Sequence, residues 1–152
     1  MSEHTFLFAD LSGFTALTEA HGDSHAADLA AAFFQDARAL LAAHGAQEVK
    51  TLGDAMMIRC DSPHGAIGLA LRLVREVGAR HGFPSVRVGM HTGPAVERDG
   101  DWFGRAVNLA ARVSGAASGG EVMVSEATAL AWPPGFPRVG ALAPSSATAT
   151  CS

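Results

Sequence analysis

The sequence predicts an α+β fold, a ferredoxin-like sandwich of the βαββαβ type in which helices pack on a mixed, largely antiparallel sheet. Apolar residues follow the periods of strands and helices in turn along the chain, and short turns join two pairs of strand-like runs. The chain has 152 residues, 48% of them hydrophobic and 17% charged, which is enough for one hydrophobic core. We therefore expect one domain over residues 1–132 and a tail over residues 133–152.

The first third of the chain predicts one strand and two helices. Residues 5–9 form an apolar run that is too short for a helix and ends at Asp10, so we expect a buried strand there. A first helix begins at Gly13. A second begins at the cap candidate Asp23, carries apolar residues at helical spacing and ends at Gly45.

A hairpin is expected next. Residues 48–52 and 55–60 are two strand-like runs, and only Gly53 and Asp54 separate them. A two-residue connection of this kind is typical of a tight hairpin turn. The tip of this hairpin therefore carries a carboxylate.

An amphipathic helix follows the hairpin, capped by Ser62 and Pro63 and ended by Gly82. Residues 86–91 then alternate between apolar and other residues with the period of a strand. We expect residues 95–97 to return as the partner of that strand, which makes a second hairpin.

The last third predicts a helix over residues 102–113, a strand over residues 121–124 and a short helix capped by Ser125. The expected order of elements is βααββαββαβα. From about Trp132 onward, Pro, Gly, Ala, Ser and Thr dominate without periodicity. This composition predicts a disordered tail.

Composition excludes several classes of protein. A net charge of −4 and a pI near 5.9 lack the basic footprint of a duplex nucleic-acid binder. No apolar run approaches the about 20 residues that cross a bilayer. The start of the chain lacks a secretory signal, and Cys60 and Cys151 make no disulfide framework. We expect a cytoplasmic protein with reduced thiols, no membrane span and no nucleic-acid partner.

Two carboxylates stand at the ends of predicted strands. Asp10 directly follows a buried strand, where an unpaired charge is costly, and Asp54 lies at the hairpin tip. If the two tips meet, their oxygens form a hard site suited to Mg²⁺ or Mn²⁺. The alternative is that Asp10 caps the following helix and Asp54 is only a turn residue.

Backbone amides beside these carboxylates are candidates for binding an anion. The free N–H groups at the start of the first helix, at Ser12, Gly13, Phe14 and Thr15, favour a phosphate next to the metals. A metal site beside an anion site indicates phosphate chemistry. His91 is a candidate general base, although a histidine at a strand end beside a turn is more often structural.

Four motifs carry a family resemblance. FADLSGFT at residues 8–15, KTLGD at 50–54, GMHTG at 89–93 and GDWFGRAVNLAAR at 100–112 resemble the catalytic domain of class III nucleotidyl cyclases, the adenylyl and guanylyl cyclases. The similarity runs from about residue 5 to residue 128, in the same order and with matching spacings. Together the four motifs are much more specific than any one of them.

The resemblance implies a role for six residues of this chain. They are Asp10 and Asp54 as ligands of two divalent cations (Mg²⁺ or Mn²⁺), Lys50 and Asp101 as the adenine-selecting pair, Asn108 as the ribose-orienting residue, and Arg112 as the residue that stabilises the transition state. It also implies a homodimer with shared sites, in which one chain holds the metals and the other supplies the remaining four residues. The implied reaction converts ATP to cyclic AMP and pyrophosphate by two-metal catalysis.

The adenine-selecting pair is chemically consistent with ATP. Adenine offers an acceptor at N1 for an ammonium and a donor amino group at N6 for a carboxylate, whereas guanine reverses both demands. Lys50 is the only lysine among the eleven basic residues of the chain. A compact ammonium and a planar guanidinium are not interchangeable at a base edge, so its retention suits this role.

The end of the chain departs from the family. Many members continue with a hairpin that contains a Leu-Lys-Gly segment, whose lysine approaches the triphosphate. Residues 134–152 contain no lysine and no recognisable strand pair. The alternative function is therefore a catalytically weak nucleotide-binding or dimerisation module.

Overall fold

The computed structural model describes residues 2–80, 84–130, 139–141 and 148–151. The strands are β1 (Glu3–Leu11), β2 (Ala46–Leu52), β3 (Ala55–Cys60), β4 (Val86–Pro94), β5 (Val96–Arg98), β6 (Asp101–Phe103), β7 (Val122–Ser125), β8 (Val139–Ala141) and β9 (Thr148–Cys151). The helices are α1 (Phe14–His21), α2 (Asp23–Leu41), α3 (Pro63–Arg72), α4 (Arg105–Ala116) and α5 (Glu126–Ala129), with a 3₁₀ turn η1 (Ala42–His44) and a π-helical turn η2 (Leu73–Val77). The predicted α+β class is confirmed.

One mixed sheet organises the chain. Its strand order is β2-β3-β1-β4-β7-β9-β8. The central strand β1 pairs antiparallel with both β3 and β4, whereas β4 pairs parallel with β7. Because β1 has a neighbour on each side, the residues at its end are placed by strands from two other parts of the sequence.

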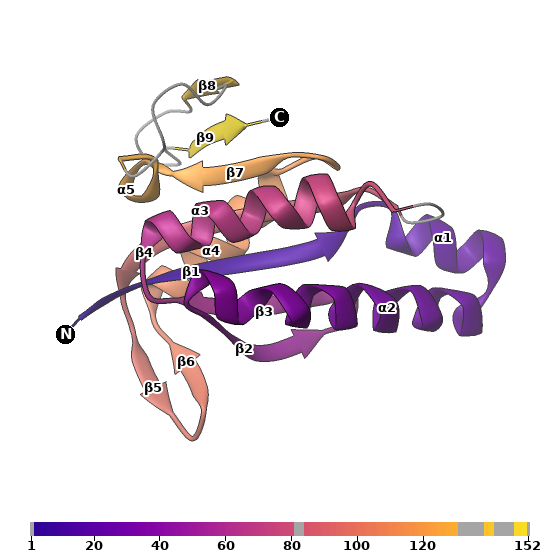
Figure 1. Ribbon diagram of the computed structural model, residues 1–152, viewed down its shortest axis with the longest axis horizontal. Coiled ribbons are helices and arrows are strands. Elements are labelled where there is room, and N and C mark those ends of the chain that lie inside the picture. Colours follow the sequence, from indigo (N-terminus) through magenta and orange to yellow (C-terminus); the bar gives the residue numbers. More distant parts are fainter. Residues whose placement is uncertain (1, 81–83, 131–138, 142–147, 152) are drawn as a thin grey trace.

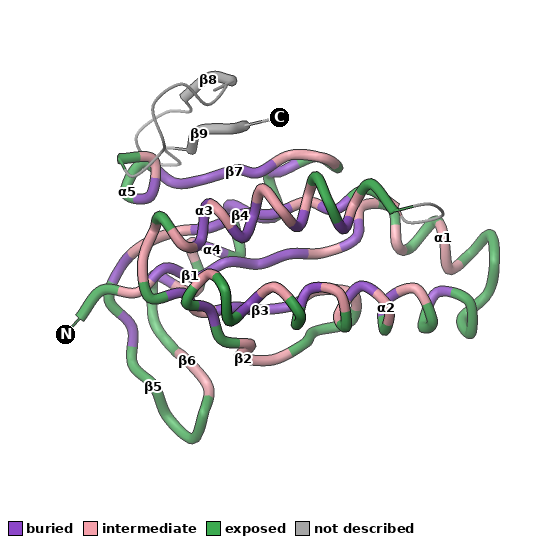
Figure 2. The backbone as a smooth tube through the Cα atoms, in the orientation of Figure 1, coloured by how far each residue is buried: buried purple, intermediate pink, exposed green. Residues whose placement is uncertain are grey.

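The two faces of the sheet have different covers (Figure 1). On one face, the odd-numbered residues of β1, such as Leu7, pack with buried side chains of α2 and α3. On the other face, Phe6 and Phe8 pack with α4 and with Trp102 of β6. Figure 2 shows strands β1, β3, β4 and β7, between these layers, as mostly buried. The face that carries α4 also carries Asp10, two residues after Phe8.

Helix α4 approaches the sheet unusually closely. A Cβ atom at Gly89 of β4 would collide with the backbone of Ser114, so only glycine permits this packing. The Ser114 hydroxyl also donates a hydrogen bond to the Phe8 carbonyl oxygen at 3.4 Å. The motif glycine at residue 89 therefore fixes the distance between α4 and the strands.

The predicted second hairpin and the helix after it are corrected by the structure. Residues 95–97 do not return along the strand 86–91, because β4 continues to Pro94 and pairs with β1. Instead β5 pairs with β6, and the helix begins at Arg105, not at residue 102. The sequence of residues 101–103 is short and continuous with the apolar pattern of α4, which concealed a separate strand.

Other elements differ at their ends. Gly22 is the N-cap of α2 in place of Asp23, and the predicted helix end at Gly82 lies outside the described residues. In the tail, where we expected no regular structure, β9 pairs with β7 and β8 pairs with β9. The predicted domain boundary at residues 132–133 lies outside the described residues. In the part of the chain that the structure describes, no helix has the length and apolarity to cross a membrane.

Candidate active site

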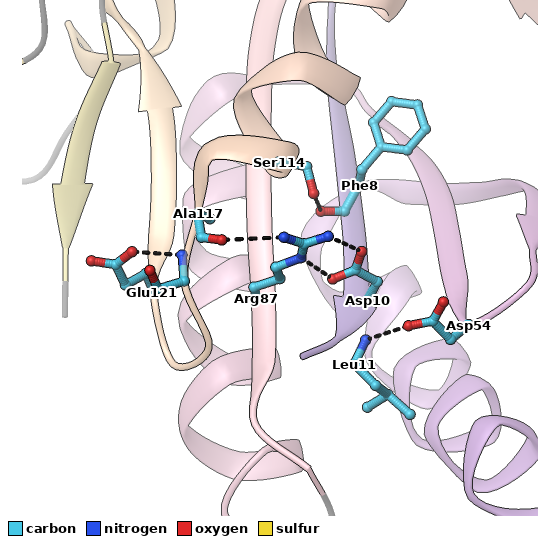
Figure 3. A network of polar contacts seen from close by, with 9 residues as sticks. Phe8, Asp10, Leu11, Asp54, Arg87, Ser114, Ala117 and Glu121 are labelled. Carbon is cyan, nitrogen blue, oxygen red and sulfur yellow. Dashed lines mark hydrogen bonds and ion pairs between the residues drawn. The ribbon is translucent and has the colours of Figure 1, made fainter. Parts of the chain in front are cut away.

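The two predicted metal carboxylates come together at the end of β1. Asp54 lies in the β2–β3 turn, which Gly53 closes with a φ of 62°. Its Oδ2 atom accepts a hydrogen bond from the backbone N–H of Leu11 at 3.2 Å, which places it beside Asp10 (Figure 3). The condition that the two tips meet is therefore fulfilled.

Arg87 of β4 forms a bidentate ion pair with Asp10. Its Nε lies 2.6 Å from Oδ1 and its Nη2 lies 3.0 Å from Oδ2 (Figure 3). Nη1 donates to the carbonyl oxygen of Ala117, at the end of α4, at 3.3 Å. The hydrogen bond with Asp10 raises the pKa of Arg87, so the guanidinium stays charged. Arg87 thus supplies the positive charge beside this carboxylate.

The electrostatics of Asp54 favour a cation at this position. Burial raises the pKa of Asp54 above its ordinary value, and the nearby charge of Asp10 raises it further, while the Leu11 amide and Arg87 lower it. A carboxylate whose ionisation is disfavoured in this way is stabilised by a positive charge beside it. Their hard oxygen donors suit Mg²⁺ or Mn²⁺.

The donor set is incomplete for a closed metal cage. Among the described residues, no group of three or more His, Cys, Asp or Glu side chains could hold an ion. Mg²⁺ is commonly bound by one or two carboxylates together with water and substrate phosphates. The pair of Asp10 and Asp54 therefore fits an ion that a phosphate ligand helps to hold.

The candidate anion-binding amides differ from one another. The Ser12 amide donates to the Ser85 carbonyl oxygen at 2.7 Å and is occupied in this structure. Gly13 has a φ of 79° and stands as the N-cap of α1, so Phe14 and Thr15 lie in the first turn. The amides of that first turn have no partner within the helix. An anion role for these positions remains a prediction.

Lys50 and Asp101 meet, although they lie 51 residues apart in sequence. The Nζ atom of Lys50, on β2, lies 2.7 Å from Oδ2 of Asp101, on β6. The backbone N–H of Trp102 donates to the other carboxylate oxygen at 2.8 Å. The hydrogen bond from Lys50, together with that amide, lowers the pKa of Asp101, so the carboxylate is ionised at neutral pH. A cationic donor and an anionic acceptor therefore stand side by side.

Asn108 and Arg112 lie four residues apart on α4, so they share one face of the helix. Both residues are exposed. In the described part of the chain, neither side chain makes a hydrogen bond or an ion pair with Asp10 and Asp54 or with Lys50 and Asp101. The structure thus assembles two pairs of predicted site residues and leaves the third pair facing solvent.

Sequence reasoning missed two residues of this region. The alternating pattern of residues 86–91 predicts a strand at Arg87 but not its contact with Asp10, which follows from the pairing register of β1 and β4. The apolar pattern of residues 102–113 predicts a helix at Trp102, whereas the structure places this residue on strand β6. For His91 the structural interpretation is favoured, since its Nδ1 lies 2.6 Å from Oγ of Ser125 and burial lowers its pKa.

Comparisons with known proteins place the chain in a family. The family model described as the adenylate and guanylate cyclase catalytic domain matches residues 1–136. A pH-sensitive adenylate cyclase of Mycobacterium tuberculosis is 42% identical over 122 residues, which covers 80% of this chain and 30% of that protein. An adenylate cyclase of Streptomyces coelicolor is 39% identical over 122 residues, which covers 80% and 32%. This chain therefore spans about a third of the length of these relatives.

Solved structures show the same fold. The guanylyl cyclase domain of a rhodopsin fusion protein from the fungus Blastocladiella emersonii, in its monomeric form, superposes with a TM-score of 0.86 at 19% identity. That match covers 98% of this chain and 94% of the solved chain.

Proposed function

Because this chain belongs to the adenylate and guanylate cyclase catalytic domain family, we propose that it converts ATP to 3′,5′-cyclic AMP and pyrophosphate. The observation that carries the choice of ATP is the contact between Lys50 and Asp101 at 2.7 Å. The Lys50 ammonium can donate a hydrogen bond to adenine N1, and the Asp101 carboxylate can accept one from the N6 amino group on the same edge of the base. Trp102 holds the second oxygen of Asp101, which leaves the carboxylate with a fixed orientation.

Asp10 and Asp54 are the proposed ligands of two divalent cations, Mg²⁺ or Mn²⁺. Such ions, when bound, acidify the ribose 3′-hydroxyl and offset the charge of the α-phosphoryl group and the departing pyrophosphate. The chain's own contribution is placement: β1 carries Asp10, and the Leu11 amide orients Asp54. Arg87 must share or release Asp10 when a cation is present.

The remaining phosphate contacts are proposed for the start of α1. The loop at Ser12 and Gly13 follows β1 directly and leads into the helix at Phe14 and Thr15. The partial positive charge of a helix N-terminus favours an anion at this position. A triphosphate that contacts ions at Asp10 would lie next to the backbone amides at the start of α1.

We propose that the active site is shared between two copies of the chain. Asn108 and Arg112 are exposed and, among the described residues, do not contact the metal pair, so a second subunit is needed to bring both sets together. In that arrangement Asn108 orients the ribose. Arg112 meets the charge that develops on the α-phosphoryl oxygens, where a fixed cation lowers the barrier most.

A second candidate is a nucleotide-binding or dimerisation module with weak catalysis. It is favoured by the sequence after residue 132, which contains no lysine that could approach a triphosphate. Such a module would bind ATP through the same Lys50 and Asp101 pair without turnover. Product formation separates the two candidates.

The decisive experiment incubates the purified protein with ATP and Mn²⁺, with GTP in parallel, and measures both cyclic nucleotides. Cyclic AMP is expected, and Asp10→Ala or Asp54→Ala should abolish it, because each removes a metal ligand. Asp36→Ala is the matched control, since this carboxylate pairs with Arg80 at 3.2 Å, away from the site. Bound ATP without product would support the module, and cyclic GMP as the main product would contradict the adenine assignment.

A further inference from the structure

The β5–β6 hairpin carries Asp101 but does not belong to the main sheet. It projects from the body of the domain (Figure 1), and Val96 and Phe103, a cross-strand pair, are 46% and 52% exposed. Trp102, between Asp101 and Phe103, packs instead into the apolar cluster on the face of the sheet that carries α4. The position of Asp101 therefore depends on how firmly the neighbouring ring is held.

Three side chains from the main sheet surround the Trp102 ring. The His4 ring lies 4.5 Å from it and the Phe6 ring lies 5.7 Å from it, between centroids, and both are tilted. The guanidinium carbon of Arg59 lies 5.4 Å from the indole centroid, within the range of a cation–π contact. Trp102 is thus fixed by contacts with β1 and β3.

Arg59 is itself held in place. One of its terminal nitrogens donates to Gln47 at 2.9 Å and to Asp61 at 3.0 Å, and the other lies 3.1 Å from Nδ1 of His4. The side chain is only 12% exposed. Its Nε is buried without a hydrogen-bond partner in the described part of the chain, an arrangement that costs stability. Because Arg59 is held in place, its contact with the Trp102 ring restrains the residue next to Asp101.

We propose that Arg59 and Trp102 are positioning residues for base selection: Arg59 fixes the indole ring, and Trp102 thereby holds Asp101 against Lys50. The connection is short, because Trp102 follows Asp101 directly and its amide donates to Asp101 Oδ1 at 2.8 Å. Strand β6 also lies against β2, which carries Lys50. Neither Arg59 nor Trp102 has to touch the nucleotide.

The base-selection part of this inference rests on the proposed function, whereas the positioning of Asp101 does not. The first readout is therefore the pKa of the Asp101 carboxyl, followed by carbon-13 NMR titration of the whole chain without nucleotide. Contact with Lys50 lowers this pKa, so Arg59→Gln and Trp102→Leu should each raise it toward its ordinary value of 3.8. Arg59 is not among the groups that directly shift the pKa of Asp101, so the change reports position.

Two further variants test the mechanism. Arg59→Lys keeps a cation near the ring and should retain most of the depression of the Asp101 pKa. Arg72→Gln is the matched control, because it removes the ion pair between Arg72, at the end of α3, and Glu76 in η2. Helix α3 packs on the opposite face of the sheet. Arg72→Gln should therefore leave the pKa of Asp101 unchanged. If Trp102→Leu does not fold, the pKa of Asp101 in Arg59→Gln decides the test.

The second readout is the ratio of kcat/KM for ATP to that for GTP. It should fall by about tenfold in Arg59→Gln, because misplaced polar groups discriminate poorly between bases, and stay constant in Arg72→Gln. An unchanged Asp101 pKa, or equal losses with ATP and GTP, would overturn the inference. A wild-type protein that forms no cyclic AMP, while its Asp101 pKa still responds to Arg59→Gln, would overturn the proposed function and leave the positioning intact.

Discussion

Arg87 and Asp10 face each other across the β1–β4 ladder and form a bidentate ion pair with contacts of 2.6 and 3.0 Å. The two side chains are only 32% and 15% exposed, so water screens the contact incompletely. An arginine therefore neutralises one of the two proposed metal ligands. A divalent cation at Asp10 has to compete with this guanidinium.

Replacing Arg87 tests that competition. Arg87→Gln should lower the melting temperature of the protein in EDTA, because the loss of a charged hydrogen-bonded pair costs roughly 1–3 kcal/mol. The increase in melting temperature on adding Mn²⁺ should be larger than in wild type, since no internal cation competes. Thermal unfolding with EDTA and with Mn²⁺ measures both effects. Equal Mn²⁺ shifts in the two proteins would contradict the competition.

Unlike Arg87, whose loss should destabilise the protein, the charge of Asp54 should cost stability in the absence of a metal ion. Its pKa is raised in the folded protein, chiefly by burial, so the ionised carboxylate costs stability at every pH above that raised value. Asp54→Asn removes the charge and can still accept the Leu11 hydrogen bond. In EDTA at neutral pH the variant should therefore melt higher than wild type.

The pH dependence of this difference has a defined sign. As pH falls through the raised pKa toward the ordinary value of 3.8, wild-type Asp54 becomes protonated and its penalty disappears. The advantage of Asp54→Asn should shrink over the same range. Mn²⁺ should raise the melting temperature of wild type but not of the variant. A variant that melts lower than wild type in EDTA would show that the charge is stabilising.

Elements with a clear apolar pattern or a cap residue were predictable from the sequence, whereas strands β6 and β9 were not. Strand β1 follows from the continuous apolar run before Asp10, and the β2–β3 hairpin follows from two strand-like runs and the Gly53–Asp54 turn between them. Strand β6 has three residues, and its pairing with β5 depends on Gly100 and on Asp99, both with positive φ. Thr148–Cys151 has no large apolar residue, so no pattern indicated strand β9.

In the candidate active site, residues within sequence motifs were predictable, and a contact set by strand pairing was not. The two pairs, Asp10 with Asp54 and Lys50 with Asp101, were predictable because all four residues belong to the motifs that carry the family resemblance. The partner of Asp10 was not, because Arg87 meets it through a strand register that relates residues 77 positions apart. Local sequence carries no information on such a register until the strands are paired.

Shared active sites predict complementation between inactive subunits. Asp54→Ala lacks a metal ligand, and Arg112→Ala lacks the proposed transition-state cation, so neither homodimer should form cyclic AMP. After the two are mixed and re-associated, each heterodimer should contain one intact site and restore activity to a fraction of wild type. Cyclic AMP formation measures the rescue, and mass spectrometry of the intact assembly verifies the heterodimer. Heterodimers without activity, or activity in either single variant, would contradict the shared site.

Base choice should follow the pair of Lys50 and Asp101. In Lys50→Glu combined with Asp101→Cys, a carboxylate replaces the ammonium and can accept the N1 hydrogen of guanine, while the complement of adenine N6 is lost. The ratio of kcat/KM for ATP to that for GTP should therefore fall by about tenfold or more, since a polar site rejects a base that leaves its groups unpaired. Lys50 makes its contact in the half-exposed region between β2 and β6, so the exchange removes no core volume. Arg38→Gln is the control, because it removes an ion pair with Glu48, also on β2, without touching Asp101. A ratio that changes equally in the double variant and in Arg38→Gln, or that does not change in either, would place base selection elsewhere in the domain.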